Sequence, residues 1–320
     1  HSYPFPFSYS VASLLQMNNP PLLPRPFHTR QGEVTRNEVF GNQKGGQFII
    51  SNFPMKSKPL DSGTFGVVYR AQWKKSHITV AIKKFVKHRC IRDRNEQSVV
   101  NEINVHNGLS HANIIQMYTA LWTRDHIYIV MEYAKCGSLY DALEALNGRR
   151  FDENTAGKYT YQIADALHYC HSKYVIHRDI KPDNILITSN GTLKLADFGC
   201  TADSRKRNIV PVGTSIYHAP EVIRVKAHGV EVDYWALGVV IHELITGRNP
   251  FIRERDLDRS IAVQDQRAMA NILRVSYRIP RTVDRGARDL IKSLLKEDPK
   301  DRMAMENVMR HDWITQMMNN

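Results

Sequence analysis

The sequence is poor in cysteine and has neither a long apolar run nor a segment typical of a secretory signal. Its 320 residues include four cysteines, and no two of them have the spacing of a metal site or a C-x-x-C motif. So few cysteines exclude a disulfide scaffold in a chain of this length and predict a reduced, intracellular protein. The longest apolar run, residues 235–245, contains His242 and Glu243, so we expect no transmembrane helix. The N-terminus has no basic segment followed by an apolar core, so no secretory signal is expected.

Basic residues outnumber acidic ones, 44 to 32, which gives a formal net charge of +12. A basic surface favours acidic partners such as nucleic acid, chromatin or acidic protein segments, but it does not identify one. A solvated basic surface is an equally good interpretation. The basic residues are spread over both halves of the chain, so we do not expect direct nucleic-acid binding.

Residues 1–47 are rich in Pro, Ser, Asn and Gly and have no sustained hydrophobic period. Their prolines interrupt any helix, so we predict a flexible, disordered tail. A docking or localisation segment is the alternative, and the residues leave it open. From Phe48 onward the composition changes to one with apolar, β-rich runs. The remaining length suffices for two lobes around a cleft.

A short polar loop in the second half of the chain has the clearest chemistry. It reads H-R-D-I-K-P-D-N over residues 177–184. An apolar, strand-like run follows, and D-F-G comes next at residues 197–199. So many polar residues at fixed positions favour a common function over chance. They are the groups that transfer of a phosphoryl group needs.

Each polar residue of these two motifs has its own expected role. Asp179 would orient an incoming hydroxyl and accept its proton, and Lys181 would offset the charge that builds up on the transferred group. Asn184 and Asp197 would hold Mg²⁺ on the phosphates of a nucleotide. The order H-R-D-x-K-x-x-N, then D-F-G, resembles the catalytic and metal-binding loops of protein kinases.

The segment D-S-G-T-F-G at residues 61–66 resembles the glycine-rich loop that covers the phosphates in kinases, with Asp61 in place of its first glycine. Gly63 and Gly66 would let backbone N–H groups approach the phosphates without a Cβ in the way. A carboxylate facing phosphate at about 8 Å would weaken ATP binding by about 2 kcal/mol per unit charge. Most of this cost disappears when Asp61 points to solvent.

Residues 67–73 and 78–85 are β-rich and predict two strands, the second of which contains V-A-I-K ending at Lys83. This lysine matches the one that pairs the α- and β-phosphates in kinases, and a surface lysine at a strand end is the alternative. Apolar residues around Glu102 recur at helical spacing and place its carboxylate beside the buried face. We therefore expect a Lys83–Glu102 ion pair. Glu96 is the competing partner, but it lies nearer the start of the helix.

Residues 127–133 form an apolar run that predicts a strand. In a kinase the adenine-binding hinge lies here, so Met131 would control the back pocket and the backbone of Glu132 and Ala134 would bind the adenine edge. The run is equally a core strand, and the two interpretations are compatible. The full expected ATP-binding set is Leu60, Gly63, Gly66, Val68, Ala81, Lys83, Met131, Glu132, Ala134 and Leu186.

The segment after D-F-G is polar and basic, and it ends in A-P-E at residues 219–221. It resembles the activation segment of a kinase, in which we single out the hydroxyls of Thr201, Ser204 and Thr214. Lys181 and the pair Gly213-Thr214 resemble the serine/threonine class of kinases and not the tyrosine class.

Two further features would support the catalytic loop. Residues 154–172 carry apolar side chains at helical spacing, which predicts a core helix beneath it. Glu221 and Arg302 would form a buried ion pair that clamps the end of the activation segment.

Longer stretches narrow the resemblance to one family. They are F-D-E at 151–153, A-D-A-L-H-Y-C-H-S-K at 164–173, E-Y-A at 132–134, G-A-R-D-L-I at 286–291 and H-D-W-I at 311–314. Together they resemble the Aurora family of mitotic serine/threonine kinases, from about Phe48 to Thr315. The resemblance implies an α+β, bilobal protein-kinase fold. We expect a small lobe at 48–133, with an antiparallel β-sheet and one main helix, and a larger, mainly α-helical lobe at 134–318.

The same resemblance implies ligands, partners and a place of action. It implies ATP and Mg²⁺, and protein substrates such as histones with an arginine before the acceptor Ser or Thr. Asp183 is the expected receiver of that arginine. An activating partner peptide would bind the small lobe. The expected setting is cell division, at chromosomes in the nucleus, at the spindle and in the cytoplasm.

The activation segment departs from this family at one position. Val210 stands where Auroras carry a threonine whose phosphate would meet Arg178 and order the segment. Our hypothesis is that the enzyme relies on a partner or is weakly active. The alternatives are a pseudokinase, favoured by Asp61 and Val210, and an active serine/threonine kinase outside the Auroras. Cys200 stands where Auroras carry tryptophan. We interpret it as a small packed residue, and a thiol that reacts with electrophiles is the alternative.

Overall fold

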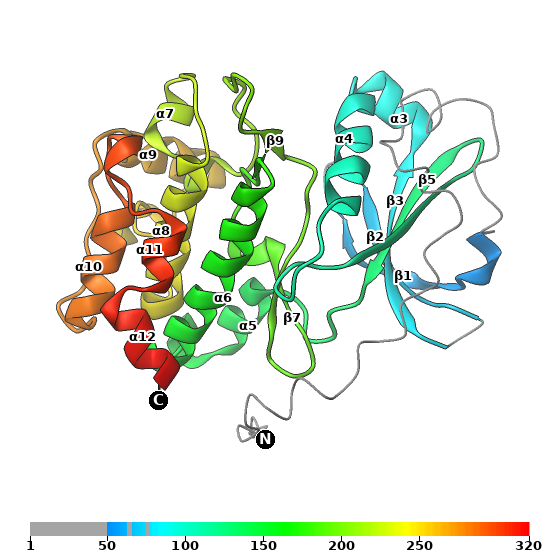
Figure 1. Cartoon of the computed structure of the whole chain (residues 1–320). Coiled ribbons are helices and arrows are strands. Elements are labelled where there is room, and N and C mark those ends of the chain that lie inside the picture. Colours follow the sequence, from blue (N-terminus) through cyan, green and yellow to red (C-terminus); the bar gives the residue numbers. More distant parts are fainter. Residues whose placement is uncertain (1–49, 63–65, 75–76, 320) are drawn as a thin grey trace.

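The structure, a computed structural model, describes residues 50–62, 66–74 and 77–319 (Figure 1). The expected tail at residues 1–47 and Gly63 of the glycine-rich loop lie outside the described residues. The described part forms a small lobe around an antiparallel sheet and a larger, mainly helical lobe. This is the bilobal α+β fold expected from the sequence.

The small lobe is built on a five-stranded antiparallel sheet with the strand order β1-β2-β3-β5-β4. Its strands are β1 (Met55–Ser62), β2 (Val67–Gln72), β3 (Thr79–Val86), β4 (Met117–Trp122) and β5 (His126–Glu132). Successive side chains along a strand point to opposite faces of the sheet. In β5, accordingly, Ile127 and Ile129 pack in one apolar cluster, and Tyr128 and Val130 pack in another. Apolar side chains therefore cover both faces.

Two helices, α3 (Lys87–Arg92) and α4 (Glu96–Asn107), lie beside this sheet (Figure 1). Val99 and Ile103 of α4 are buried in the apolar cluster on one face. Glu102, on the same helix, is only 3% exposed. Because a buried carboxylate needs a partner, α4 is oriented by that partner as well as by its apolar side chains.

The large lobe packs its helices around the buried helix α8. Its helices are α5 (Leu139–Ala145), α6 (Glu153–Ser172), α7 (Pro220–Ile223), α8 (Glu231–Thr246), α9 (Ile261–Leu273), α10 (Arg285–Leu294), α11 (Met305–Met309) and α12 (Asp312–Asn319). Four short strands form the pairs β6 (Val175–Ile176) with β9 (Ala202–Asp203) and β7 (Ile185–Ile187) with β8 (Leu193–Leu195). The 3-10 helices are η1 (Ile50–Asn52), η2 (Asn147–Arg149), η3 (Pro182–Asn184), η4 (Ser215–Tyr217), η5 (Glu254–Asp256) and η6 (Pro299–Asp301).

Helix α8 is apolar nearly all round, which is typical of a helix enclosed by others. Its Trp235 stacks on Phe251 with ring centroids 5.4 Å apart. The helix ends at Gly247, whose φ of 76° is left-handed. A Cβ there would lie 2.5 Å from the carbonyl oxygen of Gly148, so this turn requires glycine. Within the described ranges, no helix has the length and apolar character to cross a membrane.

The elements expected from the sequence are present, with small shifts at their ends. The strands expected at 67–73, 78–85 and 127–133 are β2, β3 and β5, and the helix expected at 154–172 is α6. Helix α6 begins one residue earlier than expected because Asp152 caps it. The carboxylate of Asp152 accepts a hydrogen bond of 2.9 Å from the backbone N–H of Thr155.

The expected ion pair between Glu221 and Arg302 is present and buried. Nη1 and Nη2 of Arg302 lie 2.6 and 2.7 Å from the two carboxylate oxygens of Glu221. Arg302 also donates to the backbone carbonyl of Glu231 at 2.9 Å. The bidentate geometry is the strong form of such a pair. It fastens α7, at the end of the activation segment, to the start of α8.

Candidate active site

Lys83 lies between two carboxylates where the two lobes meet. Its Nζ is 2.7 Å from Oε1 of Glu102 on α4 and 2.8 Å from Oδ1 of Asp197 in the D-F-G motif. The expected ion pair with Glu102 is therefore present, whereas the second bond, to Asp197, was not foreseen from the sequence. One amine thus connects β3, α4 and a loop of the large lobe.

The charges in this group stabilise one another. Burial by itself lowers the pKa of Lys83, but the carboxylates of Glu102 and Asp197 outweigh it and raise that pKa above its ordinary value. Loss of water raises the pKa of Asp197, yet Lys83 has the larger combined effect and brings it down to about 2. Burial raises the pKa of Glu102, and Lys83 opposes that shift. The ammonium of Lys83 and the carboxylate of Asp197 are therefore both charged near neutral pH.

The ring of Phe198 in the D-F-G motif is buried between two imidazoles. Its centroid lies 4.7 Å from that of His106 on α4 and 5.2 Å from that of His177 in the catalytic loop. Nε2 of His106 is hydrogen-bonded to the carbonyl oxygen of Ile115 at 2.7 Å, and burial lowers the pKa of His106 to about 4. Imidazole rings on both sides fix Phe198. They thereby fix its neighbour Asp197, whose φ of 60° is left-handed.

Asp179 has hydrogen-bond partners at both oxygens and is only 8% exposed. Its Oδ1 accepts from the backbone N–H and from the hydroxyl of Thr214, both at 2.9 Å. Its Oδ2 accepts from Nδ2 of Asn184 at 2.7 Å and lies 3.2 Å from Nζ of Lys181. Lys181 also donates to the hydroxyl of Thr214 at 2.6 Å. The structure therefore brings together Asp179, Lys181 and Asn184 as expected, and adds Thr214 to them.

The buried carboxylate of Asp233, on α8, holds the backbone of the catalytic loop. Oδ2 accepts from the N–H of His177 at 2.9 Å and Oδ1 from the N–H of Arg178 at 2.8 Å. Nε2 of His171 lies 2.8 Å from Oδ2. Arg178 has a φ of 68°, a conformation that costs a residue with a Cβ roughly 1–3 kcal/mol. Hydrogen bonds to a charged acceptor offset such a cost.

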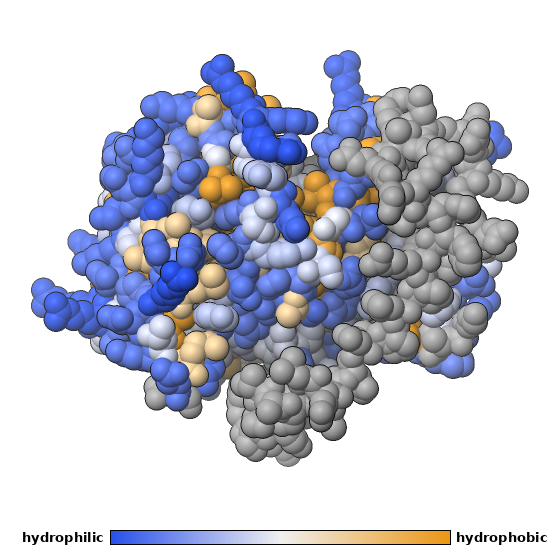
Figure 2. All heavy atoms as spheres, in the orientation of Figure 1, coloured by the Kyte–Doolittle hydropathy of each residue, from blue (hydrophilic) through white to orange (hydrophobic). Residues whose placement is uncertain are grey.

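Several residues expected to bind adenine share one small apolar cluster. Met131, Ala134 and Leu186 pack with Ile115 and Ala196. In Figure 2, apolar residues come to the surface where the two lobes meet, whereas most of the remaining face is polar. A flat apolar base could be enclosed there between the hinge and β7.

The other expected adenine and phosphate contacts lie on the sheet. Ala81 pairs with Met131 across β3 and β5, and Val68 pairs with Lys83 across β2 and β3. The carboxylate of Glu132 lies 2.9 Å from Nζ of Lys194, so this side chain is bound to the large lobe. Its backbone, at the end of β5, is in the segment expected to bind the adenine edge.

The described part of the glycine-rich loop shows where Asp61 points. Asp61 is exposed, and its Oδ1 accepts a hydrogen bond of 2.7 Å from the backbone N–H of Ser62. The cost expected for a carboxylate facing phosphate is therefore small. Leu60 is 48% exposed, and a Cβ at Gly66 would lie 2.9 Å from the carbonyl oxygen of Lys84.

A buried carboxylate near the catalytic loop was missed by sequence reasoning. Glu243 of α8 is 9% exposed and accepts a hydrogen bond of 2.8 Å from the hydroxyl of Tyr217. Burial raises the pKa of Glu243 to about 7, and Asp183 adds to the shift. Partial loss of water also raises the pKa of Asp183, with a further contribution from Asp179. The sequence feature that could have identified Glu243 is its position as a charged residue within an apolar run.

The hydroxyls singled out in the activation segment differ in access. Thr201 is 9% exposed, and its hydroxyl donates to the carbonyl oxygen of Phe198 at 2.9 Å. Ser204 is half-buried. Val210 is 62% exposed.

Comparison with known proteins places this site in a family. The profile described as protein kinase domain matches residues 55–314. The chain is 43% identical to Aurora/IPL1-related protein kinase 2 of Caenorhabditis elegans, over 94% of this chain and 92% of that protein. It is 40% identical to Aurora kinase of Schizosaccharomyces pombe, over 84% and 73% of the two chains. It is 38% identical to Aurora kinase B of Mus musculus, over 86% and 76%. The chain is a protein kinase of the Aurora family.

As an Aurora kinase, the chain phosphorylates Ser or Thr of protein substrates and uses ATP with a divalent metal ion. The residues fit such a cation. Nδ2 of Asn184 is committed to Asp179, so the amide group has its oxygen left for a metal, and Asp197 supplies a carboxylate. Small divalent cations prefer oxygen ligands of these kinds.

Replacing Lys83 should change how the site of this Aurora kinase responds to pH. Asp197 has a folded-state pKa below 3.8, so its pairing stabilises the fold above about pH 4 and is lost as the pH falls toward about 2. Lys83 has a pKa raised above 10.5, so its contribution persists into the alkaline range. Lys83→Met should therefore lower the free energy of unfolding most at neutral and mildly alkaline pH, where both carboxylates would lose their cationic partner, and by less below about pH 4.

Urea unfolding of both proteins across this pH range measures the difference. The matched control is Lys84→Met, which alters the next residue of β3 and leaves Asp197 paired. An equal loss of stability at all pH values in Lys83→Met would contradict the assignment of the pair.

Proposed function

We propose that this Aurora kinase transfers the γ-phosphoryl group of ATP, bound with Mg²⁺, with Asp179 as the catalytic base. The observation that carries this proposal is the hydroxyl of Thr214, 2.9 Å from Oδ1 of Asp179 and 2.6 Å from Nζ of Lys181. It supports the view that a hydroxyl can be held between a base and a cation at this point. An acceptor Ser or Thr would bring its own hydroxyl to the same carboxylate.

The other residues of the site would bind the phosphates and compensate their charge. Lys181 would place positive charge beside the group in transfer, and Lys83, held by Glu102, would bind the phosphates of ATP. Asn184 and Asp197 would hold the metal ion, which would shield the charge of the phosphates. Positioning and charge compensation of this kind account for most of the catalysis of phosphoryl transfer.

Asp179→Asn tests the role of the base. The amide keeps the shape of the side chain but accepts no proton, so kcat should fall by roughly 10²–10⁴-fold while KM for ATP stays within about twofold. Transfer of radiolabelled phosphate to a basic Ser peptide measures both constants. Asp258→Asn, which makes the same change at an exposed position, serves as the control.

The same assay distinguishes an active kinase from a pseudokinase. A pseudokinase would show no transfer by the unaltered chain above the level of Asp179→Asn. That outcome would overturn the proposed function while leaving the fold and the family unchanged.

We propose that Asp183 receives an arginine that precedes the acceptor in the substrate. Asp183 is exposed, and its pKa is raised by partial burial, with Asp179 and Asp141 adding to the shift. Glu243, buried with the neutral hydroxyl of Tyr217 as its partner, adds a second carboxylate to the same region. A guanidinium would relieve the repulsion among these acids and form charge-assisted hydrogen bonds.

A peptide with citrulline in place of that arginine isolates the charge. For the unaltered chain, kcat/KM should fall by roughly 10- to 100-fold with citrulline, mainly through KM, because a charge-assisted contact is lost. In Asp183→Asn the two peptides should differ by less than about threefold. Steady-state kinetics with both peptides measures this, with Asp258→Asn as the control. An undiminished preference for arginine in Asp183→Asn would place the arginine elsewhere.

We also propose that an activating partner peptide binds the small lobe near α3. Two observations support this. Nζ of Lys87, at the start of α3, is buried without a hydrogen-bond partner among the described residues, and Ile91 is 51% exposed. Adding an Aurora activating peptide to the transfer assay tests it, and an unchanged kcat would count against it.

The setting that we propose is cell division, with action on chromosomal proteins including histones, at the spindle and in the cytoplasm. Family membership supports it. We further propose the division into a tail at 1–47, a small lobe at 48–133 and a large lobe at 134–318. Imaging of a fluorescent fusion through division tests the setting, and exclusion from chromosomes and spindle would contradict it.

A further inference from the structure

The side chain of Arg178 is bound to the backbone of the activation segment. Its Nε donates to the carbonyl oxygen of Cys200 at 2.7 Å, and its Nη2 donates to that of Thr201 at 3.2 Å. Its own N–H is held by Asp233. The guanidinium thus reaches from the catalytic loop to the residues directly after D-F-G. Two neutral carbonyls therefore accept from two of its five N–H donors.

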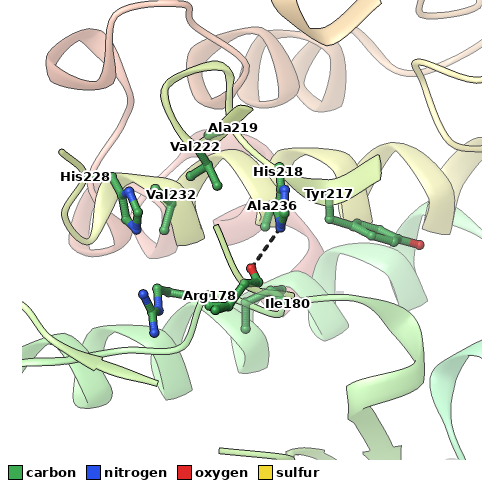
Figure 3. A pocket seen from close by; sticks show the side chains of 10 residues that line it. Arg178, Ile180, Tyr217, His218, Ala219, Val222, His228, Val232 and Ala236 are labelled. Carbon is green, nitrogen blue, oxygen red and sulfur yellow. Dashed lines mark hydrogen bonds between the residues drawn. The ribbon is translucent and has the colours of Figure 1, made fainter. Parts of the chain in front are cut away.

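A small cavity lies on one side of Arg178. A cavity of about 10 Å³ lies between Arg178, Val222, His228 and Val232, among other residues (Figure 3). That volume admits about one water molecule. In Figure 3 the imidazole of His228 and the guanidinium of Arg178 lie on the same side of this cavity. Nε2 of His228 is buried without a hydrogen-bond partner among the described residues, and a cavity of this size leaves it only a water.

The first half of the activation segment is fastened by backbone pairing. Strand β9 pairs with β6, which directly precedes the catalytic loop, through Val175 with Asp203 and Ile176 with Ala202. The N–H of Ser204 continues this pairing by donating to the carbonyl of Tyr174 at 2.9 Å. None of these bonds needs a charged group.

The second half is fastened in the same way. The carbonyl of Asn208 accepts from the N–H of His228 at 2.9 Å, and Nδ2 of Asn208 closes a turn by donating to the carbonyls of Asp203 and Lys206. Further on, Gly213 has a φ of 94°, and a Cβ there would lie 2.5 Å from the carbonyl oxygen of Arg178. The segment therefore passes directly against the catalytic loop before Thr214 binds Asp179.

We propose that Arg178 positions the activation segment through the carbonyls of Cys200 and Thr201, so that catalysis by this chain does not require a phosphate on the segment. Val210, at the position where the resemblance calls for a phosphorylated threonine, is exposed, and its side chain has no hydroxyl that could carry a phosphate. The hydroxyl of Thr201 is buried and already used. On sequence alone, valine at 210 favoured weak activity or dependence on a partner; these contacts favour a segment that is ordered by itself.

Removal of phosphate tests the proposal directly. The full chain is treated with a broad-specificity phosphatase, the loss of phosphate is verified by intact mass, and kcat and KM are measured with a basic Ser peptide. We expect kcat to stay within about twofold of the untreated enzyme, because the bonds that hold the segment contain no phosphate. A fall of about tenfold or more, with recovery after rephosphorylation on Thr201 or Ser204, would overturn the proposal while leaving the kinase assignment intact.

The variant Arg178→Lys, treated with phosphatase in the same way, tests whether Arg178 positions the activation segment. A lysine keeps the charge but lacks the planar fork that reaches two carbonyls, so kcat should fall by roughly tenfold while KM for ATP stays within about twofold. The matched control is Arg207→Lys, the same change at an exposed arginine of the same segment, with kcat expected to be unchanged. Equal kcat values for Arg178→Lys and the unaltered chain would remove Arg178 from this role.

A second variant covers the case in which Arg178→Lys does not fold, as judged by thermal unfolding. Asn208→Ala deletes the two hydrogen bonds that close the turn of the segment and leaves the catalytic loop untouched. Without phosphate, we expect trypsin to cleave after Arg207 several times faster than in the unaltered chain, with a lower kcat and the same KM for ATP. Unchanged cleavage and kcat would show that these neutral contacts do not order the segment.

Discussion

The active site depends on one buried positive charge with two negative partners. A lone ammonium would be expensive to bury, so Lys83 is stable in the interior only while Glu102 and Asp197 both approach it. Those carboxylates come from α4 and from the D-F-G loop, which belong to different lobes. The same contact therefore sets the angle of α4, the position of the Asp197 carboxylate and the closure of the two lobes. Burial of His106 against Phe198 supports this arrangement with apolar contact.

Asp233 is a second buried charge that holds its surroundings in place, here inside the large lobe. This carboxylate is completely buried in a mostly apolar helix, and it accepts hydrogen bonds from the backbone N–H groups of His177 and Arg178. Since those N–H groups converge on one side chain, the catalytic loop takes a left-handed conformation at Arg178. Rigid helices thus support a strained loop, as is common where reacting groups need accurate placement. Neutral carbonyls from the activation segment then complete the contacts of the Arg178 side chain.

The sequence was sufficient to predict the two lobes, the main strands and helix α6, since apolar periodicity and polar breaks are local properties. Helical spacing around Glu102 predicted its pair with Lys83, and resemblance to the kinase activation segment predicted the pair of Glu221 with Arg302. Neither predicted that Lys83 also binds Asp197 or that Thr214 binds Asp179. Both contacts join segments that are far apart in the chain and have no periodic signature. Glu243 was overlooked because a charge within an apolar run looks the same whether it serves a site or a core.

The hydroxyl of Thr214 has a consequence for the enzyme at rest. Together with the neighbouring N–H, it fills both lone pairs of one oxygen of Asp179, while Asn184 and Lys181 engage the other. A water molecule that approaches Asp179 must break one of these hydrogen bonds, and it makes no other contact with the enzyme that would compensate for the loss. A protein substrate breaks the same contact while its flanking residues hold it in place. With Asp179 as the proposed base, this contact would protect the resting enzyme against hydrolysis of ATP by water.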